Sequence, residues 1–225
     1  MSRRRRPESE QRLSRAESKA LTHRALLSAA LRLLAHNSFD SISLREVTKK
    51  AGISPTAFYR HFDDMEALGL ELVDESFGSL RASVRAARTD QSIYDDAIRG
   101  SIAVVAQHVN DHTDHMRFMS RERHGGIRRI RQAIRRELRL FADELAIDLA
   151  SFPVHSKFST EDRRMMADLI VGTIVTLSGE LTDATEAEGE ELVARATQQL
   201  RLITLGATRW RSDQPNRLAY DPADR

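Results

Sequence analysis

Apolar residues recur at helical spacing along most of the chain. Between about Ser18 and His36, one face carries an apolar residue at every turn: Leu26, Leu27, Ala30, Leu33 and Leu34. Such a stripe marks the buried side of an amphipathic α-helix. The same spacing predicts further helices over residues 63–88, 93–110, 115–121, 126–150, 160–182 and 188–211. With only 10 glycines and 5 prolines in the sequence, the pattern predicts an all-α protein.

Two short helical patterns meet within residues 42–62. Ser43 and Glu46 have the spacing of a capping box, in which each side chain satisfies a free backbone N–H at a helix start. Gly52 stands where this helix ends, because glycine enters the left-handed conformation without a steric clash. Ser54 and Pro55 then begin a second helix as its N-cap and first residue. The stretch therefore predicts a helix-turn-helix.

The second of these helices has an outward face suited to DNA. Phe58 and Phe62 share one side, whereas Thr56, Tyr59 and Arg60 point the other way. Hydroxyl, phenol and guanidinium groups on a short helix can contact bases and phosphates in a major groove. Neighbouring hydroxyls, charges and helix-start N–H groups supply further phosphate contacts. We therefore predict DNA contacts at Ser43, Lys49, Ser54, Pro55, Thr56, Tyr59, Arg60 and His61.

The segment AGISPTAFYRHF, preceded by SLREVTKKA, resembles the helix-turn-helix of the TetR family of transcriptional regulators. The resemblance implies an N-terminal three-helix head that binds double-stranded DNA. It also implies a larger helical body that binds a ligand and forms a homodimer, which would pair two heads with a palindromic operator. The chain departs from the family at Met65, where most members carry a lysine that meets a phosphate.

We expect four segments along the chain. These are a flexible basic arm (1–17), the helix-turn-helix domain (18–62), the ligand-binding and dimerisation domain (63–211) and a disordered tail (212–225). Residues 1–24 hold eight basic and three acidic side chains, although the formal charge of the whole chain is only +2. Such an arm either contacts DNA or remains a solvated tail.

Composition excludes several kinds of protein. The absence of cysteine excludes disulfides, thiolate metal sites and a cysteine nucleophile. No apolar run approaches the roughly 18 residues of a membrane span, and the arginine-rich start is not followed by the apolar segment of a secretory signal. We expect a cytoplasmic protein without a membrane partner.

Three longer stretches resemble one branch of the family. They are SLREVTKKAGISPTAFYRHFDDMEALGLELVDES, FMSRERHG and IRRELRLFADELA, and they look like the fatty-acid-biosynthesis repressors of the FabR and DesT kind. The resemblance implies a repressor of lipid genes whose effector is a long-chain acyl-CoA or acyl carrier protein thioester. No cofactor is expected beside that effector.

Apolar residues of the body can line a channel for an acyl chain, and methionine suits variable ligand shapes. The alternative is that these residues only fill the core, as apolar helical stripes usually do. Two arginines of the RER triplet match the branch and could bind the polar end of the ligand. The predicted ligand residues are Phe118, Met119, Arg121, Arg123, Phe141, Leu145, Ile170, Thr173 and Leu177.

The last two predicted helices are candidates for a dimer interface. They carry small and branched residues at helical spacing: Leu169, Thr173, Val175, Leu177, Leu192, Ala196, Leu200, Ile203 and Gly206. Two helices from each subunit can form a four-helix bundle. Alternatively, these residues close the subunit's own core. The family resemblance favours the interface.

Other classes of function find less support in the sequence than a DNA-binding repressor does. His108, His112 and His115 have spacings that could bring them together as metal ligands, but they complete no known motif and we predict no metal site. No nucleophile elbow, Walker loop or dinucleotide-binding glycine pattern is present, so we predict no enzyme. A TetR-type repressor that senses a drug or another small apolar molecule, for example one controlling efflux, remains the alternative.

Overall fold

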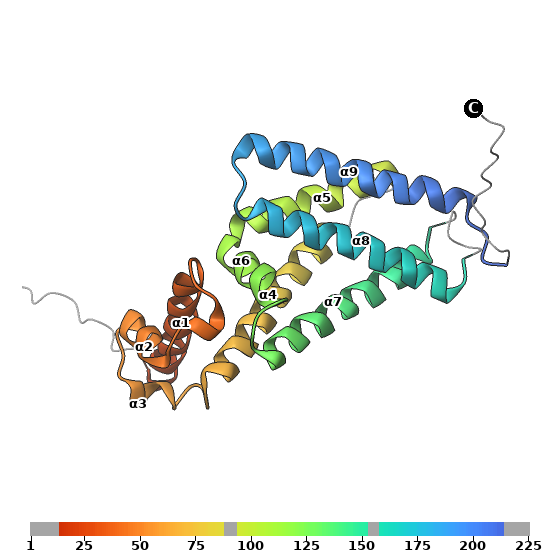
Figure 1. Ribbon diagram of the computed structural model, residues 1–225. Coiled ribbons are helices and arrows are strands. Elements are labelled where there is room, and N and C mark those ends of the chain that lie inside the picture. The colour runs from red at the N-terminus through yellow and green to blue at the C-terminus, as the bar shows by residue number, and fades with distance from the viewer. Residues whose placement is uncertain (1–13, 88–93, 153–157, 214–225) are drawn as a thin grey trace, which may run out of the picture.

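The structure, a computed structural model, describes residues 14–87, 94–152 and 158–213. These residues form nine α-helices and one 3-10 turn without a strand, which confirms the all-α prediction (Figure 1). The elements are α1 (Arg15–Leu34), η1 (Phe39–Ser41), α2 (Leu44–Ala51), α3 (Pro55–Phe58), α4 (Met65–Ala87), α5 (Tyr94–Asp111), α6 (Thr113–Glu122), α7 (Arg128–Leu149), α8 (Thr160–Leu181) and α9 (Glu186–Arg209). None of the described helices is long and apolar enough to cross a membrane.

Helices α1, α2 and α3 form the head at one end of the molecule (Figure 1). Ser14 caps α1 in a capping box with Glu17, so this helix begins at Arg15, three residues before the boundary expected at residue 18. Residues 15–17 of the predicted basic arm thus belong to α1, and residues 1–13 lie outside the described residues. Most of the predicted tail, residues 214–225, lies outside them too.

Local signals place the two helices of the motif as predicted. Ser43 and Glu46 make the capping box of α2, and Gly52 ends it with a φ of 74°, in the left-handed region. Ser54 caps α3 by accepting a hydrogen bond from the Ala57 N–H at 3.3 Å. Because each signal depends on neighbours three or four residues away, the sequence alone suffices to find it.

The residue that caps α4 is Asp64, one position after the one that the sequence spacing favours. The spacing of Asp63 and Glu66 predicts a second capping box, but the structure corrects this, because the Asp64 carboxylate accepts a 2.7 Å hydrogen bond from the Ala67 N–H. The helix begins at Met65.

The largest hydrophobic cluster joins head and body. It contains Phe39, Val47 and Phe58 of the head together with Phe118 of α6 and Ile130 of α7. The body helices α7, α8 and α9 lie side by side, with α4, α5 and α6 packed against them (Figure 1). The head therefore packs against the first half of α4, the end of α6 and the start of α7, and not against α4 alone.

The contact of α4 with α7 and η1 is unusually close at Gly69. A Cβ atom at this position would lie 2.5 Å from Ile130 Cδ1 and 2.7 Å from Phe39 Cζ. Both of those side chains are buried. The three elements thus meet where only a residue without a side chain fits.

The residues predicted for a dimer interface divide between two faces of α8 and α9. Leu177, Ala196 and Leu200 are buried in the subunit's own core, with Leu192 and Ile203 packed against them. On other faces, apolar side chains are exposed on α8 and α9: Met165, Leu169, Leu202 and Leu205. Five of the nine residues predicted for the dimer interface therefore pack in the subunit's own core.

Candidate DNA interface and ligand cavity

The outward face of α3 and the turn after it is polar and exposed. Phe58 and Phe62 are buried, whereas Thr56, Tyr59 and Arg60 are exposed, with Tyr59 at 60%. The phenol ring of Tyr59 meets Phe58 edge to face, with ring centroids 5.7 Å apart. The helical part of this segment is a single turn, and Tyr59 is its C-cap. Most of the predicted contact residues thus lie together on one open surface.

The two serines of the interface differ in what they can offer to a phosphate. The Ser43 hydroxyl donates to Glu46 Oε2 at 2.7 Å and accepts from the Glu46 N–H, so both of its roles serve the helix. The Ser54 hydroxyl only accepts, which leaves its own proton for a phosphate oxygen. Lys49 is exposed in the last turn of α2, and Pro55 is exposed in the first position of α3.

His61 lies partly beneath this surface. Its ring packs near His23 of α1, with centroids 5.8 Å apart, and its Nδ1 is buried without a hydrogen-bond partner among the described residues. Burial lowers the pKa of His61, and the positive charges of His23, Lys19 and Arg60 lower it further. A contact between His61 and the DNA backbone would therefore involve Nε2 of a neutral ring.

The body contains an apolar cavity of about 550 Å³. Helices α4, α5, α6, α7 and α8 all contribute to its wall, and α9 adds Leu200. The size falls within the range of small-molecule sites. Its polar lining is sparse and includes Ser120 and Arg123 near one end of α6 and Asp148 and Ser151 near the end of α7. A cavity of this kind accepts a largely apolar ligand that carries a few polar groups.

Five of the nine predicted ligand residues line this cavity: Met119, Arg123, Phe141, Leu145 and Ile170. The remaining four do not. Phe118 is buried in the cluster beneath the head, with its ring 6.2 Å from that of Phe39. Leu177 packs in the cluster between α5, α8 and α9. Thr173 points its hydroxyl back to the Leu169 carbonyl oxygen, as threonine often does within a helix.

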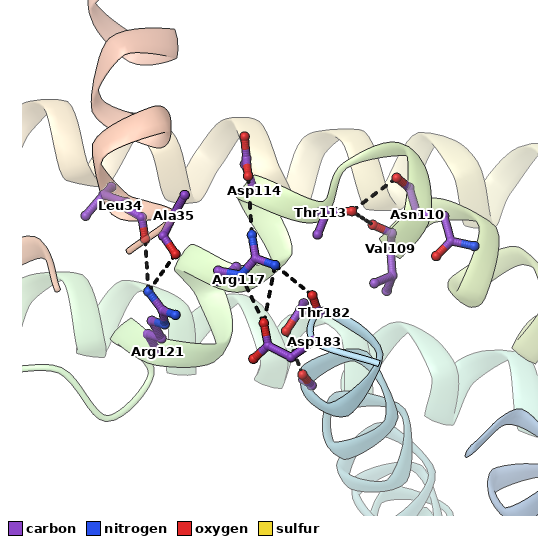
Figure 2. Close-up of polar contacts among 11 residues, drawn as sticks. Leu34, Ala35, Val109, Asn110, Thr113, Asp114, Arg117, Arg121, Thr182 and Asp183 are labelled. Carbon is purple, nitrogen blue, oxygen red and sulfur yellow. Dashed lines mark hydrogen bonds and ion pairs between the residues drawn. The ribbon is translucent and has the colours of Figure 1, made fainter. Parts of the chain in front are cut away.

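Arg121 is the fourth residue outside the cavity. Its guanidinium donates hydrogen bonds of 3.1 Å to the carbonyl oxygens of Leu34 and Ala35, at the C-terminal end of α1 (Figure 2). A cation at this end of a helix satisfies free carbonyls and interacts well with the helix dipole. Arg121 therefore connects α6 to the DNA-binding head and does not line the cavity.

The next two residues of the triplet have separate roles. Glu122 is buried, and its Oε1 accepts a 2.8 Å hydrogen bond from the Phe39 N–H in η1. Burial raises the pKa of this carboxyl, and the nearby Asp40 raises it further, against the opposing hydrogen bond from Phe39. Arg123 caps the end of α6 and lines the cavity. Three consecutive residues thus contact the head twice and the cavity once, an arrangement that sequence spacing did not reveal.

The other side of α6 is tied to the far part of the body. Arg117 donates to the Thr182 carbonyl oxygen at 2.7 Å and pairs with Asp183 at 3.3 Å, both in the turn between α8 and α9 (Figure 2). It also lies 3.5 Å from Asp114 of its own helix. Helix α6 therefore connects the head to the turn between α8 and α9.

The three histidines at the α5–α6 junction face α4. His108 Nδ1 lies 3.0 Å from the Ser83 hydroxyl, and His112 Nε2 lies 3.3 Å from that of Ser79. The ring centroids of His108 and His112 are 4.5 Å apart. Within the described ranges, no group of three or more histidine and acidic residues is arranged to hold a metal ion. The histidines are interhelical packing residues.

A helix-turn-helix head with an exposed polar face, joined to a helical body that contains an apolar cavity, is the architecture of a DNA-binding regulator. Residues 26–72 match the family of bacterial regulatory proteins of the tetR type, and residues 95–206 match the tetracyclin repressor-like C-terminal domain. A Haemophilus influenzae protein described as an uncharacterized HTH-type transcriptional regulator is 39% identical over 194 residues, which cover 86% of this chain and 93% of that protein. The chain therefore belongs to the TetR family of transcriptional regulators, which are not enzymes.

Solved structures share the fold. The fatty acid degradation regulator FadR from Bacillus halodurans matches with a TM-score of 0.67 at 17% identity, covering 84% of this chain and 97% of that one. FadR from Bacillus subtilis, solved in complex with stearoyl-CoA, matches with a TM-score of 0.63 at 18% identity, covering 82% and 98%. At these identities the likeness concerns the fold.

Proposed function

We propose that this TetR-family regulator represses fatty-acid or desaturase genes and that its effector is a long-chain acyl-CoA or another acyl thioester. The observation that carries the proposal is the apolar cavity, whose wall includes Arg123 at the end of the same helix that contacts the head. The resemblance to the FabR and DesT branch supports this ligand class. The fold likeness to a FadR protein in complex with stearoyl-CoA supports it as well.

The lining of the cavity suits an acyl chain. Met116 and Met119 from α6 are flexible enough to follow chains of different length or saturation. Each methylene buried contributes about 0.8 kcal/mol, or roughly a fourfold gain in affinity. Arg123 and the serines nearby are the polar groups available for a thioester carbonyl or a phosphate.

Helix α6 is the proposed route from ligand to DNA. A ligand in the cavity contacts Met119 and Arg123, and the residues between and beside them hold α1 and η1. A ligand shifts the head only if it binds one position of α6 more tightly than another. The sign of the response, release from DNA or tightening on it, follows from which position the ligand favours.

The regulator is proposed to act as a homodimer on a palindromic operator. The exposed apolar residues of α8 and α9, Met165, Leu169, Leu202 and Leu205, are the surface we assign to the second subunit. A two-fold axis there would present the two heads to two half-sites, one helical turn or a multiple of a turn apart.

The test uses the full chain and DNA upstream of its own gene and of neighbouring genes. Gel shifts with and without saturated and unsaturated acyl-CoA of increasing length should show an altered affinity that grows with chain length up to the capacity of the cavity. A drug-sensing repressor would instead ignore the whole series. Extraction of the purified protein distinguishes the two, because an acyl chain in the extract supports the lipid effector.

A further inference from the structure

Helix α7 begins with two arginines, Arg128 and Arg129, and the second of them pairs with the start of α4. Arg129 Nη1 is 2.7 Å from Glu66 Oε1 in the first turn of α4. The next residue, Ile130, packs at Gly69 and so fixes the register of the two helices. The Arg129 side chain is nevertheless 67% exposed, and Arg128 is exposed beside it. Figure 1 shows the start of α7 against the first half of α4, toward the end of the molecule where α3 lies.

These arginines are unfavourable for α7 considered alone. The N-cap residue, Ile127, makes no side-chain hydrogen bond, and the first turn contains no acidic residue. Free N–H groups already make a helix start positive, so cations there cost stability and an anion is favoured. The start of α7 therefore presents a concentration of positive charge.

The segment that joins the recognition helix to α4 has the opposite charge. Residues 63–66 contribute three carboxylates, from Asp63, Asp64 and Glu66, and no cation. They follow closely after Tyr59 and Arg60, where DNA phosphates are expected. Without compensation, these carboxylates would repel the phosphate backbone.

We propose that Arg129, with Arg128 beside it, binds a phosphate of the DNA backbone at the edge of the helix-turn-helix. The Arg129 side of its pair with Glu66 is solvent-exposed, whereas the Glu66 side is partly buried, so the guanidinium keeps N–H groups open to a phosphate while it holds this partner. Arginine binds phosphate with two parallel hydrogen bonds. The body thus contributes directly to DNA binding, beyond the residues of the head.

The alternative anion is the phosphate of a coenzyme A ligand. On α7 the residues that line the cavity begin at Ile134, and neither Arg128 nor Arg129 belongs to its wall. Arg129 is instead held on the α4 side by Glu66. The geometry therefore favours DNA.

The test is the salt dependence of DNA binding, measured by fluorescence anisotropy between 50 and 200 mM salt. The full chain is compared with Arg129→Gln on a duplex from its own promoter and on an unrelated duplex. Loss of one phosphate contact lowers the slope of log K against log salt by about 1 on both duplexes. The defect of the variant then shrinks about fourfold across this salt range. Arg139→Gln is the matched control, an exposed arginine about 15 Å further along α7.

A double variant separates direct contact from simple charge compensation. Removing Arg129 also leaves Glu66 unpaired, so Glu66→Gln/Arg129→Gln is measured beside the single variants. A direct contact predicts that the double variant keeps the reduced slope. Recovery of wild-type affinity and slope in the double variant would overturn the proposal, as would equal behaviour of Arg129→Gln and Arg139→Gln. An Arg129→Gln variant that loses stearoyl-CoA binding with unchanged DNA binding would assign the anion to the ligand and also overturn it.

Discussion

The carboxylate of Glu122 in α6 accepts a 2.8 Å hydrogen bond from the backbone N–H of Phe39. The 3-10 turn that begins at Phe39 has no cap from its own neighbour, because the Ser38 side chain makes no capping hydrogen bond. A residue 83 positions away supplies it. Together with the hydrogen bonds from Arg121 to the end of α1, this bond attaches the end of α6 to the DNA-binding head.

Glu122→Ala should destabilise the protein by about 1–3 kcal/mol, because the buried Phe39 N–H loses its acceptor. Glu122→Gln keeps an acceptor and should cost less. Because the folded-state pKa of Glu122 is raised, its contribution to stability is present below pH about 4.5 and is lost as pH rises through the folded pKa. Urea unfolding across pH 4.5–7.5 checks this. A pH dependence unchanged by Glu122→Gln would contradict the role given to the carboxyl.

Gly69 and Gly78 form a matched pair on α4. Gly69→Ala places a methyl group against Ile130 and Phe39, and overpacking of this kind costs about 1–3 kcal/mol, partly offset by the helix preference of alanine. Nothing lies within 4 Å of a Cβ at Gly78. Gly78→Ala should therefore stabilise by up to about 1 kcal/mol. Thermal unfolding that ranks the two variants the other way would refute the close contact.

Acid should weaken the junction of α4 with α5 and α6. Burial lowers the pKa of His108 in the folded protein, and His112 lowers it further, opposed by Asp111. The unfolded chain therefore binds this proton more readily, so the stability is present above pH about 6.5 and is lost as pH falls below it. On α4, the Ser83 hydroxyl faces His108. On α5 and at the start of α6, the titratable neighbours of His108 are His112, His115 and Asp111. The melting temperature of His108→Asn should fall less than that of the wild type between pH 7.5 and 5.5. An equal fall would show that protonation of His108 is not the cause of the acid sensitivity.

Tyr59→Ala and Arg60→Ala separate the two kinds of DNA contact. If Tyr59 meets a phosphate, its removal weakens binding to all sequences alike. If Arg60 reads a base, its removal costs about 1–3 kcal/mol on the operator and relaxes preference at particular base pairs. Competition binding against a panel of single-base operator variants measures both. Wild-type affinity and preference in both variants would remove these residues from the interface.

The neighbouring arginines of α6 give opposite expectations. Arg123→Gln alters the cavity wall and should weaken acyl-CoA binding while the affinity of the ligand-free protein for DNA is kept. Arg121→Gln breaks the bonds to α1 and should retain acyl-CoA binding but reduce its effect on DNA affinity. Calorimetry and anisotropy on each variant provide the two readouts. Identical defects would mean that α6 does not divide the roles as described.

Local chemistry made the head predictable, whereas the cavity was only partly so. Caps at Ser43 and Ser54 and the turn at Gly52 depend on residues a few positions apart. Helical periodicity shows that Phe118, Phe141 and Leu177 are apolar and inward-facing, but it does not show whether the facing helices leave space. Phe141 borders the cavity, and the other two are packed in clusters.

The contacts between head and body join residues far apart in the sequence, and the prediction missed them for that reason. Arg121 and Arg123 carry the same side chain in one triplet, yet one donates to α1 and the other lines the cavity. The pairing of Arg129 with Glu66 spans 63 positions and leaves no local pattern. The contacts of these three arginines become visible only once the positions of α6 and α7 in the fold are known.

The proposed coupling of the cavity to the DNA-binding head can be measured as the ratio of the operator dissociation constants at saturating stearoyl-CoA and without it. We expect the dissociation constant to change by at least about fivefold, within the usual range of allosteric coupling. Operator DNA should change the affinity for stearoyl-CoA by the same factor, as thermodynamic linkage requires. An operator affinity that no acyl-CoA of any chain length alters would contradict this coupling.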